Sequence, residues 1–278
     1  MLGAKDPSIA KHLGAKSRLI IQGIHDPDIA LLNRTVPTPA TSDVPLTLQC
    51  LSSLQSDIWV ADVKAAFTQG ERHQRPDRIF VTQPTEGVPG EPPDMIIELL
   101  TEVYGLVTGP PGWRRSLMGT LKSLGFKNHP LAPCVVCMYE THNGVPDALT
   151  GMICVETDDL MGGGVGELWF DAIQKLRKRY NFGKWTELME KSTEYGGRTL
   201  KQNKDYSVTI SMVRYLQERA RPIHLDRGRC KDPMQDANAD EITAMRGLSA
   251  NSIGPLVRAC PTEVETRAYS APPFRNLR

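Results

Sequence analysis

The residues best suited to chemistry are the adjacent acids Asp158 and Asp159, which closely follow the apolar run Leu149–Val155 and precede Gly162–Gly164. Adjacent carboxylates at the end of a buried strand repel each other and are costly to desolvate, so a divalent cation is the obvious compensating charge. Hard carboxylate oxygens favour Mg²⁺ or Mn²⁺ over zinc. An Asp-Asp pair that opens a Gly-rich turn is also common solvated turn chemistry, and the pair alone leaves both interpretations open.

A third acid, Asp62, lies inside the apolar run Ile58–Val63. Charged side chains are almost never fully buried alone, so Asp62 needs a partner. One solution is neutralisation by Lys64 or by a buried Arg. The other is a sheet on which two strands bring three carboxylates together, where they would hold two divalent ions and support an in-line phosphoryl or nucleotidyl transfer.

The elements that must position these acids follow from the spacing of apolar residues. Ile58–Val63 is a nearly continuous β-branched and aromatic run, which predicts a strand buried on both faces. Apolar runs on either side of a turn-rich segment predict a hairpin of Cys134–Tyr139 and Leu149–Val155. Helical spacing predicts helices over Leu46–Leu54, Trp113–Leu124 with Gly125 as its C-cap, and Glu167–Tyr180.

The remaining segments are shorter or irregular. Ser17–Gly23 predicts a short strand, and Thr199–Ser211 predicts a second hairpin with its turn at 203–205. The stretch Pro84–Pro93 is too constrained for a helix or a central strand. From Asp226 onward the periodicity fades, which predicts an irregular tail.

Composition restricts the class of protein. The chain has 278 residues, a net charge of +1 and six scattered cysteines, which indicates a globular chain in a reducing compartment rather than a disulfide framework. Cys134 and Cys137 form a single CxxC, interpreted as two small residues of an apolar run. No apolar run approaches a membrane span or a signal peptide. Nucleic-acid binding would need local charge, and Lys201–Lys231 has eight Lys or Arg against three acids, although a solvated helix face would look the same.

The chain resembles the reverse transcriptase of Copia-type LTR retrotransposons from about Ala15 to Leu225. The matching blocks stand in the order found in that family. They are AKSRLIIQG (15–23), DVKAAFTQG (62–70), FVTQPTEG (80–87), EVYGLVTGPPGW (102–113), LGF (124–126), TDDLMGGG (157–164) and YGGRTLKQNKDYSVTIS (195–211). One block would be chance, whereas seven in order are specific.

The resemblance implies an α+β fold, a right-hand polymerase palm with partial fingers in which an antiparallel sheet is backed by helices. It implies an RNA-directed DNA polymerase that adds deoxynucleotides to a primer 3′-OH. Asp62 and Asp158 would hold two Mg²⁺ (or Mn²⁺) ions, and Asp159 would complete the carboxylate triad.

Further residues carry over from the family individually. Phe67 would lie beneath the sugar of the incoming nucleotide and exclude a 2′-OH, although an ordinary core Phe fits equally well. Lys16 and Arg18 would grip the triphosphate, and without the resemblance they are better explained as exposed edge-strand charges. The segment Tyr195, Gly196 and Gly197 resembles the primer grip, where glycines allow close approach of the primer backbone.

Two positions depart from the family. Glu156 replaces the usual aromatic two residues before the Asp pair, so that a fourth acid stands near the metals, where it would raise their affinity or misplace the primer terminus. Val107 and Thr108 replace the common Lys-Gln and remove a polar group that would contact the nucleotide.

The domain organisation expected from the resemblance has three parts. Residues 1–14 are an N-terminal remnant, and residues 15–225 are the reverse transcriptase, with a primer-grip-like hairpin at 195–211. Residues 226–278 form the tail, in which no RNase H constellation is recognised. We expect a fragment of a Pol polyprotein, with RNase H and integrase elsewhere. Its partners would be an RNA or DNA template–primer and deoxynucleoside triphosphates, and its location the cytoplasm, with a virus-like particle or the nucleus also compatible.

Two other functions fit the residues. The first is a catalytically inactive transposon relic that at most binds nucleic acid. The second is an unrelated metal-dependent nucleotidyl or glycosyl transferase that uses the acidic pair, which a large separation of Asp62 from Asp158 would favour.

Overall fold

The computed structural model describes residues 20–214, except 76, 85, 86, 89, 143 and 144, together with residues 217, 239, 240, 242, 243 and 266–268. Clustering of the chain's contacts gives two compact units, Met1–Val36 with Ala65–Leu117, and Pro37–Lys64 with Met118–Arg278. The three candidate carboxylates all belong to the second unit.

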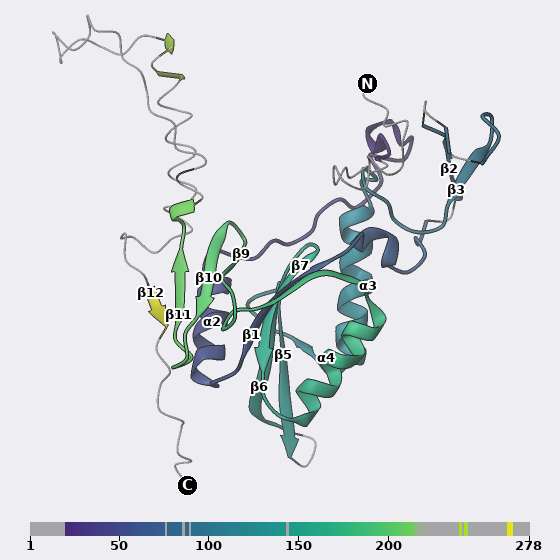
Figure 1. Cartoon of the computed structure of the whole chain (residues 1–278). Coiled ribbons are helices and arrows are strands. Elements are labelled where there is room, and N and C mark those ends of the chain that lie inside the picture. Colours follow the sequence, from purple (N-terminus) through teal and green to yellow (C-terminus); the bar gives the residue numbers. More distant parts are fainter. Residues whose placement is uncertain are drawn as a thin grey trace, which may run out of the picture. The chain divides into compact units, whose positions relative to one another are not determined.

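A six-stranded sheet forms the centre of the second unit as far as the chain is described (Figure 1). Its order is β4-β5-β6-β7-β1-β8, and every neighbouring pair is antiparallel. The strands are β1 (Ile58–Val63), β4 (Lys127–Asn128), β5 (Val135–His142), β6 (Val145–Glu156), β7 (Asp159–Gly164) and β8 (Phe182–Glu187). The strand predicted at 58–63 and the hairpin predicted around Leu149–Val155 are confirmed.

One face of this sheet packs against helix α2 (Asp43–Ser53). Because side chains alternate along a strand, Ile58 and Val60 point to this face and join a buried cluster with Leu48 of the helix. The predicted apolar helix face is confirmed, and the helix begins earlier than the apolar pattern, at Asp43, whose Oδ2 accepts the backbone N–H of Ala40 at 2.8 Å.

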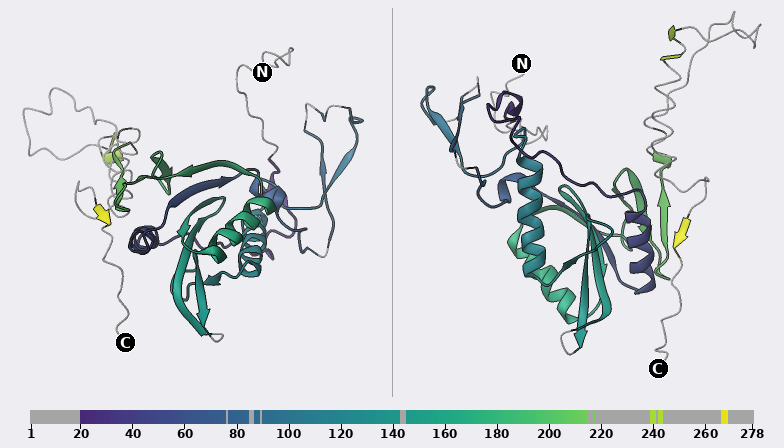
Figure 2. Two further views of the ribbon diagram at one scale, coloured as in Figure 1. Left: turned by 60° about the horizontal axis from the view of Figure 1, so that its bottom comes forward. Right: turned by 180° about the vertical axis from the view of Figure 1, so that it is seen from behind.

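The opposite face of the sheet is covered by α4 (Glu167–Arg179), as Figure 2 shows. Trp59 of β1 points to this face and stacks on Trp185, with ring centroids 4.2 Å apart. Trp169 of α4 is also fully packed, at 2% exposure. The prediction that β1 is buried on both faces is therefore confirmed, since five of its six residues are buried.

The glycines Gly162–Gly164 lie in strand β7, not in the Gly-rich turn that the sequence indicated. The turn is formed by Thr157 and Asp158 instead. The reason is the bulk of the Trp169 indole. A Cβ on Gly164 would lie 2.4 Å from Cδ2 of Trp169, and one on Gly151 of the neighbouring strand would lie 2.3 Å from its Cε3. Gly164 and Gly151 leave room for the indole against the sheet.

A second antiparallel sheet with the order β12-β11-β10-β9 belongs to the same unit. Its strands are β9 (Thr193–Tyr195), β10 (Arg198–Gln202), β11 (Val208–Ser211) and β12 (Thr266–Ala268). β10 and β11 confirm the second predicted hairpin, and Leu200 and Val208 join the cluster around α2. β12 gives strand structure to three residues of the stretch expected to be irregular.

The first unit holds shorter elements. They are the 3-10 helices Gly23–His25 and Ala66–Gln69, the hairpin β2 (Ile79–Thr82) with β3 (Ile96–Leu99), and most of α3 (Gly109–Ser123). The helix predicted from Trp113 is confirmed, and Gly125 follows it with φ +96°. Where described, Pro84–Pro93 forms neither helix nor strand, as predicted.

The strand predicted over Ser17–Gly23 is wrong for its described residues. Residues 20–22 form no strand, and Gly23 opens a 3-10 helix. The backbone N–H of Ile21 donates to the carbonyl of Tyr104 at 2.8 Å, and a Cβ on Gly23 would lie 2.3 Å from the carbonyl oxygen of Gly105. The two backbones cross too closely here for an extended ladder, and only glycine fits at the crossing.

Within the described part of the chain, no helix is long and apolar enough to cross a membrane.

The packing of Trp169 against glycine gives a stability prediction. Gly164→Ala forces the indole or the adjacent carbonyl of Thr150 to move, because the new Cβ would lie 2.4 and 2.6 Å from them. We expect it to lower the free energy of unfolding by about 2–3 kcal/mol in urea titrations. The matched control is Gly119→Ala in α3, where a Cβ meets nothing within 4 Å. It should raise the free energy by about 0.5–1 kcal/mol. Equal effects of the two substitutions would contradict this account.

Candidate active site

Three acids lie in one row across the middle of the six-stranded sheet. In the strand register, Glu156 of β6 is opposite Asp159 of β7, and Asp159 is opposite Asp62 of β1. Residues directly opposite in an antiparallel pair point to the same face, with Cβ atoms about 4.5–5.5 Å apart. The row therefore presents three neighbouring carboxylates on the face that also carries Val60 and α2.

Asp158 lies beside this row, in the two-residue turn between β6 and β7. Thr157 of the turn has φ +55°, a left-handed conformation that is costly for a β-branched residue. The carbonyl of Asp158 accepts the backbone N–H of Val63 at 2.9 Å. The segments that carry Asp62 and Asp158 are therefore in direct contact, although about a hundred residues separate them in sequence.

Like charges and burial act together on Asp159. Burial raises its pKa to about 6, and the neighbouring charges of Asp158, Asp62 and Glu156 contribute in the same direction. Among the described residues, neither Asp62 nor Asp159 forms an ion pair with Lys or Arg. The ion pair with Lys64 or a buried Arg that would have neutralised Asp62 is therefore not found, and the negative charge of the row has no compensating cation from these side chains.

The donor set fits a hard divalent cation, because all four groups offer carboxylate oxygens, and burial together with their like charges raises the pKa of Asp159. As the side chains stand, no three His, Cys, Asp or Glu residues in the described ranges converge closely enough to hold a metal ion. A ligand set of Asp62, Asp158 and Asp159 would therefore form by side-chain rotation about a backbone that already brings the three residues together.

Gly183 of β8 is a site residue that the sequence did not reveal. A Cβ at this position would lie 2.7 Å from Oδ2 of Asp62. The register between β1 and β8 shifts between Ala61 and Val63, next to Asp62, so the strands are irregular at this point. Gly183 leaves the space that the carboxylate of Asp62 occupies. Gly183 lies outside the seven motif blocks that carry the family resemblance, so those motifs do not point to it.

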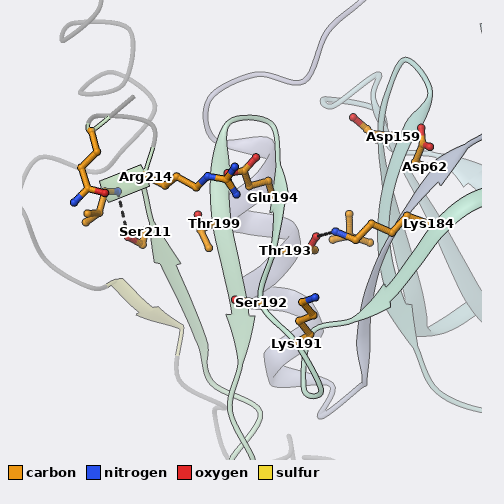
Figure 3. A pocket seen from close by; sticks show the side chains of 13 residues that line it. Asp62, Asp159, Lys184, Lys191, Ser192, Thr193, Glu194, Thr199, Ser211 and Arg214 are labelled. Carbon is orange, nitrogen blue, oxygen red and sulfur yellow. Dashed lines mark hydrogen bonds and ion pairs between the residues drawn. The ribbon is translucent and has the colours of Figure 1, made fainter. Parts of the chain in front are cut away.

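A cleft of about 610 Å³ opens beside Asp62 and Asp159 (Figure 3). The six-stranded sheet lines it on one side and the smaller sheet on the other. Its further lining residues are Val60, Lys184, Lys191, Ser192, Thr193, Glu194, Thr199, Ser211, Val213, Arg214 and Gln217. The Nζ of Lys184 donates to Oγ1 of Thr193 at 2.7 Å, and Arg214 pairs with Glu194 at 3.2 Å. The cleft is therefore acidic at one end and rich in cations and hydroxyls along its length.

The segment Tyr195, Gly196 and Gly197 lies near the acidic row. Tyr195 is 2% exposed, and its hydroxyl donates to the carbonyl of Cys154 at 2.9 Å, so its side chain is a packing residue of the unit. Gly196 and Gly197 have φ +55° and +72°, as a tight hairpin turn requires. A Cβ on Gly196 would also lie 2.8 Å from Oε2 of Glu156. Any contact of this segment with a primer would therefore come from the glycine backbone, not from the Tyr195 side chain.

The other predicted residues lie elsewhere. Phe67 belongs to the first unit, where it is 9% exposed and packs on Tyr104 with ring centroids 4.7 Å apart. Lys16 and Arg18 lie outside the described residues, as do most of the basic residues of the stretch 201–231. Thr108, one of the departures from the family, donates its hydroxyl to Oε2 of the buried Glu102 at 2.8 Å.

The raised pKa of Asp159 gives a stability prediction that can be tested without measuring catalytic activity. Since folding raises its pKa to about 6, the folded protein binds this proton more tightly than the unfolded chain, and the stability that this provides is lost as the pH rises from about 4 through 6. Asp159→Asn should therefore exceed the wild type in free energy of unfolding at pH 7.5 without divalent cations. We expect about 1–2 kcal/mol, reduced by solvent screening of the half-buried group.

The two proteins should converge near pH 4, which urea titrations across the pH range would measure. The control is Asp147→Asn, at an exposed residue of β6, which should show no such pH-dependent gain. A difference that is constant from pH 4 to pH 7.5 would argue against repulsion within the row.

A family model described as reverse transcriptase (RNA-dependent DNA polymerase) matches residues 4–227, which is most of the chain and includes every residue of the acidic row. Comparison with curated proteins gives no match.

Proposed function

The chain belongs to the reverse transcriptase (RNA-dependent DNA polymerase) family, and on that premise we propose that its acidic row is the polymerase active centre. The reaction is template-directed addition of a deoxynucleotide to a primer. The primer 3′-OH attacks the α-phosphorus of the triphosphate, a new P–O bond forms and pyrophosphate leaves. The observation that carries the proposal is the register that places Asp62 opposite Asp159, with Asp158 bonded to the adjoining Val63.

Reverse transcriptases in general use divalent metal ions. In this chain Asp62, Asp158 and Asp159 would hold two Mg²⁺ or Mn²⁺ ions, which lower the pKa of the attacking hydroxyl and stabilise charge on the transferred phosphate. The chain's own contribution is to hold the carboxylates close enough to attract such ions. The raised pKa of Asp159 supports this, because burial and the neighbouring acids disfavour its charged form, which a bound cation would stabilise.

The family assignment also supports roles outside the row. The six-stranded sheet with α2 and α4 would be the palm, and the first unit would contain the partial fingers. The backbone at Gly196 and Gly197 would contact the primer, and Phe67 would lie beneath the sugar. Lys16 and Arg18 would hold the triphosphate.

The element would be of the Copia type, with the chain acting as part of a Pol polyprotein whose RNase H and integrase lie elsewhere. We propose the cytoplasm, a virus-like particle or the nucleus as its place of action. The template–primer and deoxynucleoside triphosphates are the partners that a reverse transcriptase domain implies.

Glu156 makes this centre more acidic than the family pattern. It lies opposite Asp159 and contributes to the raised pKa of that residue. In the proposed polymerase it would strengthen the attraction for divalent cations, while its contact with the Gly196 turn brings the same charge close to the expected primer path.

Two competing functions remain distinct from this proposal. In the first, the chain is a catalytically inactive relic that binds nucleic acid. In the second, it is an unrelated metal-dependent nucleotidyl or glycosyl transferase. The contact between Asp158 and Val63 supports the polymerase over the second, since that alternative is favoured by a wide separation of Asp62 and Asp158.

Primer extension on an RNA template tests the proposal directly. With Mg²⁺ or Mn²⁺ the wild type should extend a primer, and Asp158→Asn should reduce the rate at least about 10²-fold, because the metal ions that would stabilise the transferred phosphate lose one carboxylate ligand. Gel analysis of labelled primers measures the rate of primer extension. If the wild type and Asp158→Asn both bind the template–primer equally and neither extends it, the chain is a relic.

Gly183 gives a second kinetic prediction. In Gly183→Ala the new Cβ displaces the carboxylate of Asp62, the end of a side chain, so the fold should survive while the active centre is distorted. We expect kcat for primer extension to fall about 10–100-fold with an unchanged melting temperature. Gly119→Ala, which is exposed in α3, should leave kcat unchanged. A Gly183→Ala protein with full kcat would show that Asp62 does not need this space.

A further inference from the structure

Two lysines of the cleft form a feature that the polymerase assignment does not use. Lys184 lies on β8, next to Gly183 and therefore beside Asp62. Its Nζ donates to the neutral hydroxyl of Thr193, at 2.7 Å, and forms no ion pair with Asp62. Lys191 precedes β9 and is exposed, and within the described residues its side chain has neither an ion pair nor a hydrogen bond. We call these two residues the lysine wall.

The acids of the cleft do not neutralise the lysine wall. Glu194 is paired with Arg214 at 3.2 Å, and Asp62 and Asp159 are not paired with either lysine. Ser192, Thr199 and Ser211, which also line the cleft, add hydroxyl donors. Lysine ammonium groups and Ser or Thr hydroxyls are the groups that commonly contact nucleic-acid phosphates.

Resting on the proposed polymerase function, we propose that Lys184 and Lys191 bind backbone phosphates of the primer strand close to its 3′ end. Lys184 adjoins the acidic row, and Lys191 lies farther along the cleft (Figure 3). A strand whose 3′-OH lies at Asp62 and Asp159 carries its phosphates away from the acids one nucleotide at a time, and the two cations follow that direction.

The spacing favours a strand over the triphosphate of the incoming nucleotide. A triphosphate concentrates its charge at one point and must lie at the carboxylates, whereas the two lysines are distributed along a cleft of about 610 Å³. The acidic row also repels an approaching polyanion. Cations beside it would offset that repulsion where the strand passes, which gives the lysine wall a function that a solvated surface lysine lacks.

Equilibrium binding of a labelled template–primer to the full chain tests the lysine wall without catalysis. Fluorescence anisotropy is measured in EDTA, without nucleotide, over a series of KCl concentrations. Lys184→Gln and Lys191→Gln should each weaken binding about 3–10-fold at moderate salt, and each should reduce the slope of log K against log[salt] by about 1. Lys184→Arg should restore both values. Lys178→Gln, at an exposed residue of α4 on the opposite face of the sheet, is the matched control and should match the wild type.

Neutral methylphosphonate linkages locate the phosphates. Four primers are compared, each with one neutral linkage at a different one of the last four positions. At one position the linkage should weaken binding to the wild type but should not weaken binding to Lys184→Gln any further. A similar position farther from the 3′ end should appear for Lys191→Gln. Thermal melting of each variant shows whether it is folded, and Lys191→Gln, a change at an exposed side chain, keeps the test valid if Lys184→Gln is unstable.

The outcomes separate this proposal from the polymerase function. If primers are extended but the substitutions leave the salt slope and the methylphosphonate pattern unchanged, the proposal that the lysine wall binds primer phosphates is wrong and the polymerase function is supported. If no primer is extended and the substitutions still have their expected effects, the lysine wall stands and the polymerase fails for this chain. A wild type that does not bind the template–primer overturns the proposal that the lysine wall binds primer phosphates. So does an effect confined to KM for the nucleotide, which would assign the lysines to the triphosphate.

Discussion

The central constraint on the second unit is that its fold holds like charges close together against their repulsion. Glu156, Asp159 and Asp62 are consecutive neighbours across three hydrogen-bonded strands, and Asp158 joins them from the adjoining turn. Burial, together with their repulsion, raises the pKa of Asp159 to about 6. An isolated hairpin would separate such charges. Here apolar packing on both faces of the sheet fixes the strands. The carboxylates therefore stay close together despite their repulsion, and their negative charge attracts cations.

Small residues let this packing and this charge coexist. Gly164 and Gly151 leave room for Trp169, so that α4 can cover one face of the sheet. Gly183 leaves room for the carboxylate of Asp62 on the other face. Thr157 accepts a left-handed conformation in the turn before Asp158, at a conformational cost that the surrounding sheet must offset. The same strands therefore belong to the packed core of the unit and carry its acidic row.

The cleft beside the row is lined by residues of both sheets of the unit. Its acidic end and its lysine wall have opposite charges and face a common space. In a reverse transcriptase domain, the first would act on the end of a primer and the second on its backbone. Near-zero net charge over the whole chain conceals this local separation, because the acids and the cations cancel in the sum.

Local sequence determined the elements and the identity of the acids. The nearly continuous apolar run at Ile58–Val63 and the helical periodicity of Glu167–Tyr180 predict their elements, and ordered motifs single out Asp62, Asp158 and Asp159 before any coordinates. Only the tertiary structure decided the register that sets Glu156 opposite Asp159, the burial of Tyr195, and the positions of Gly183 beside Asp62 and of Lys184 in the cleft. Periodicity reports which face of an element is apolar, but strand register and contacts between distant segments depend on how the whole unit packs. Gly162–Gly164 likewise suggested a turn, although they lie in a strand in which Gly164 packs against Trp169 of α4.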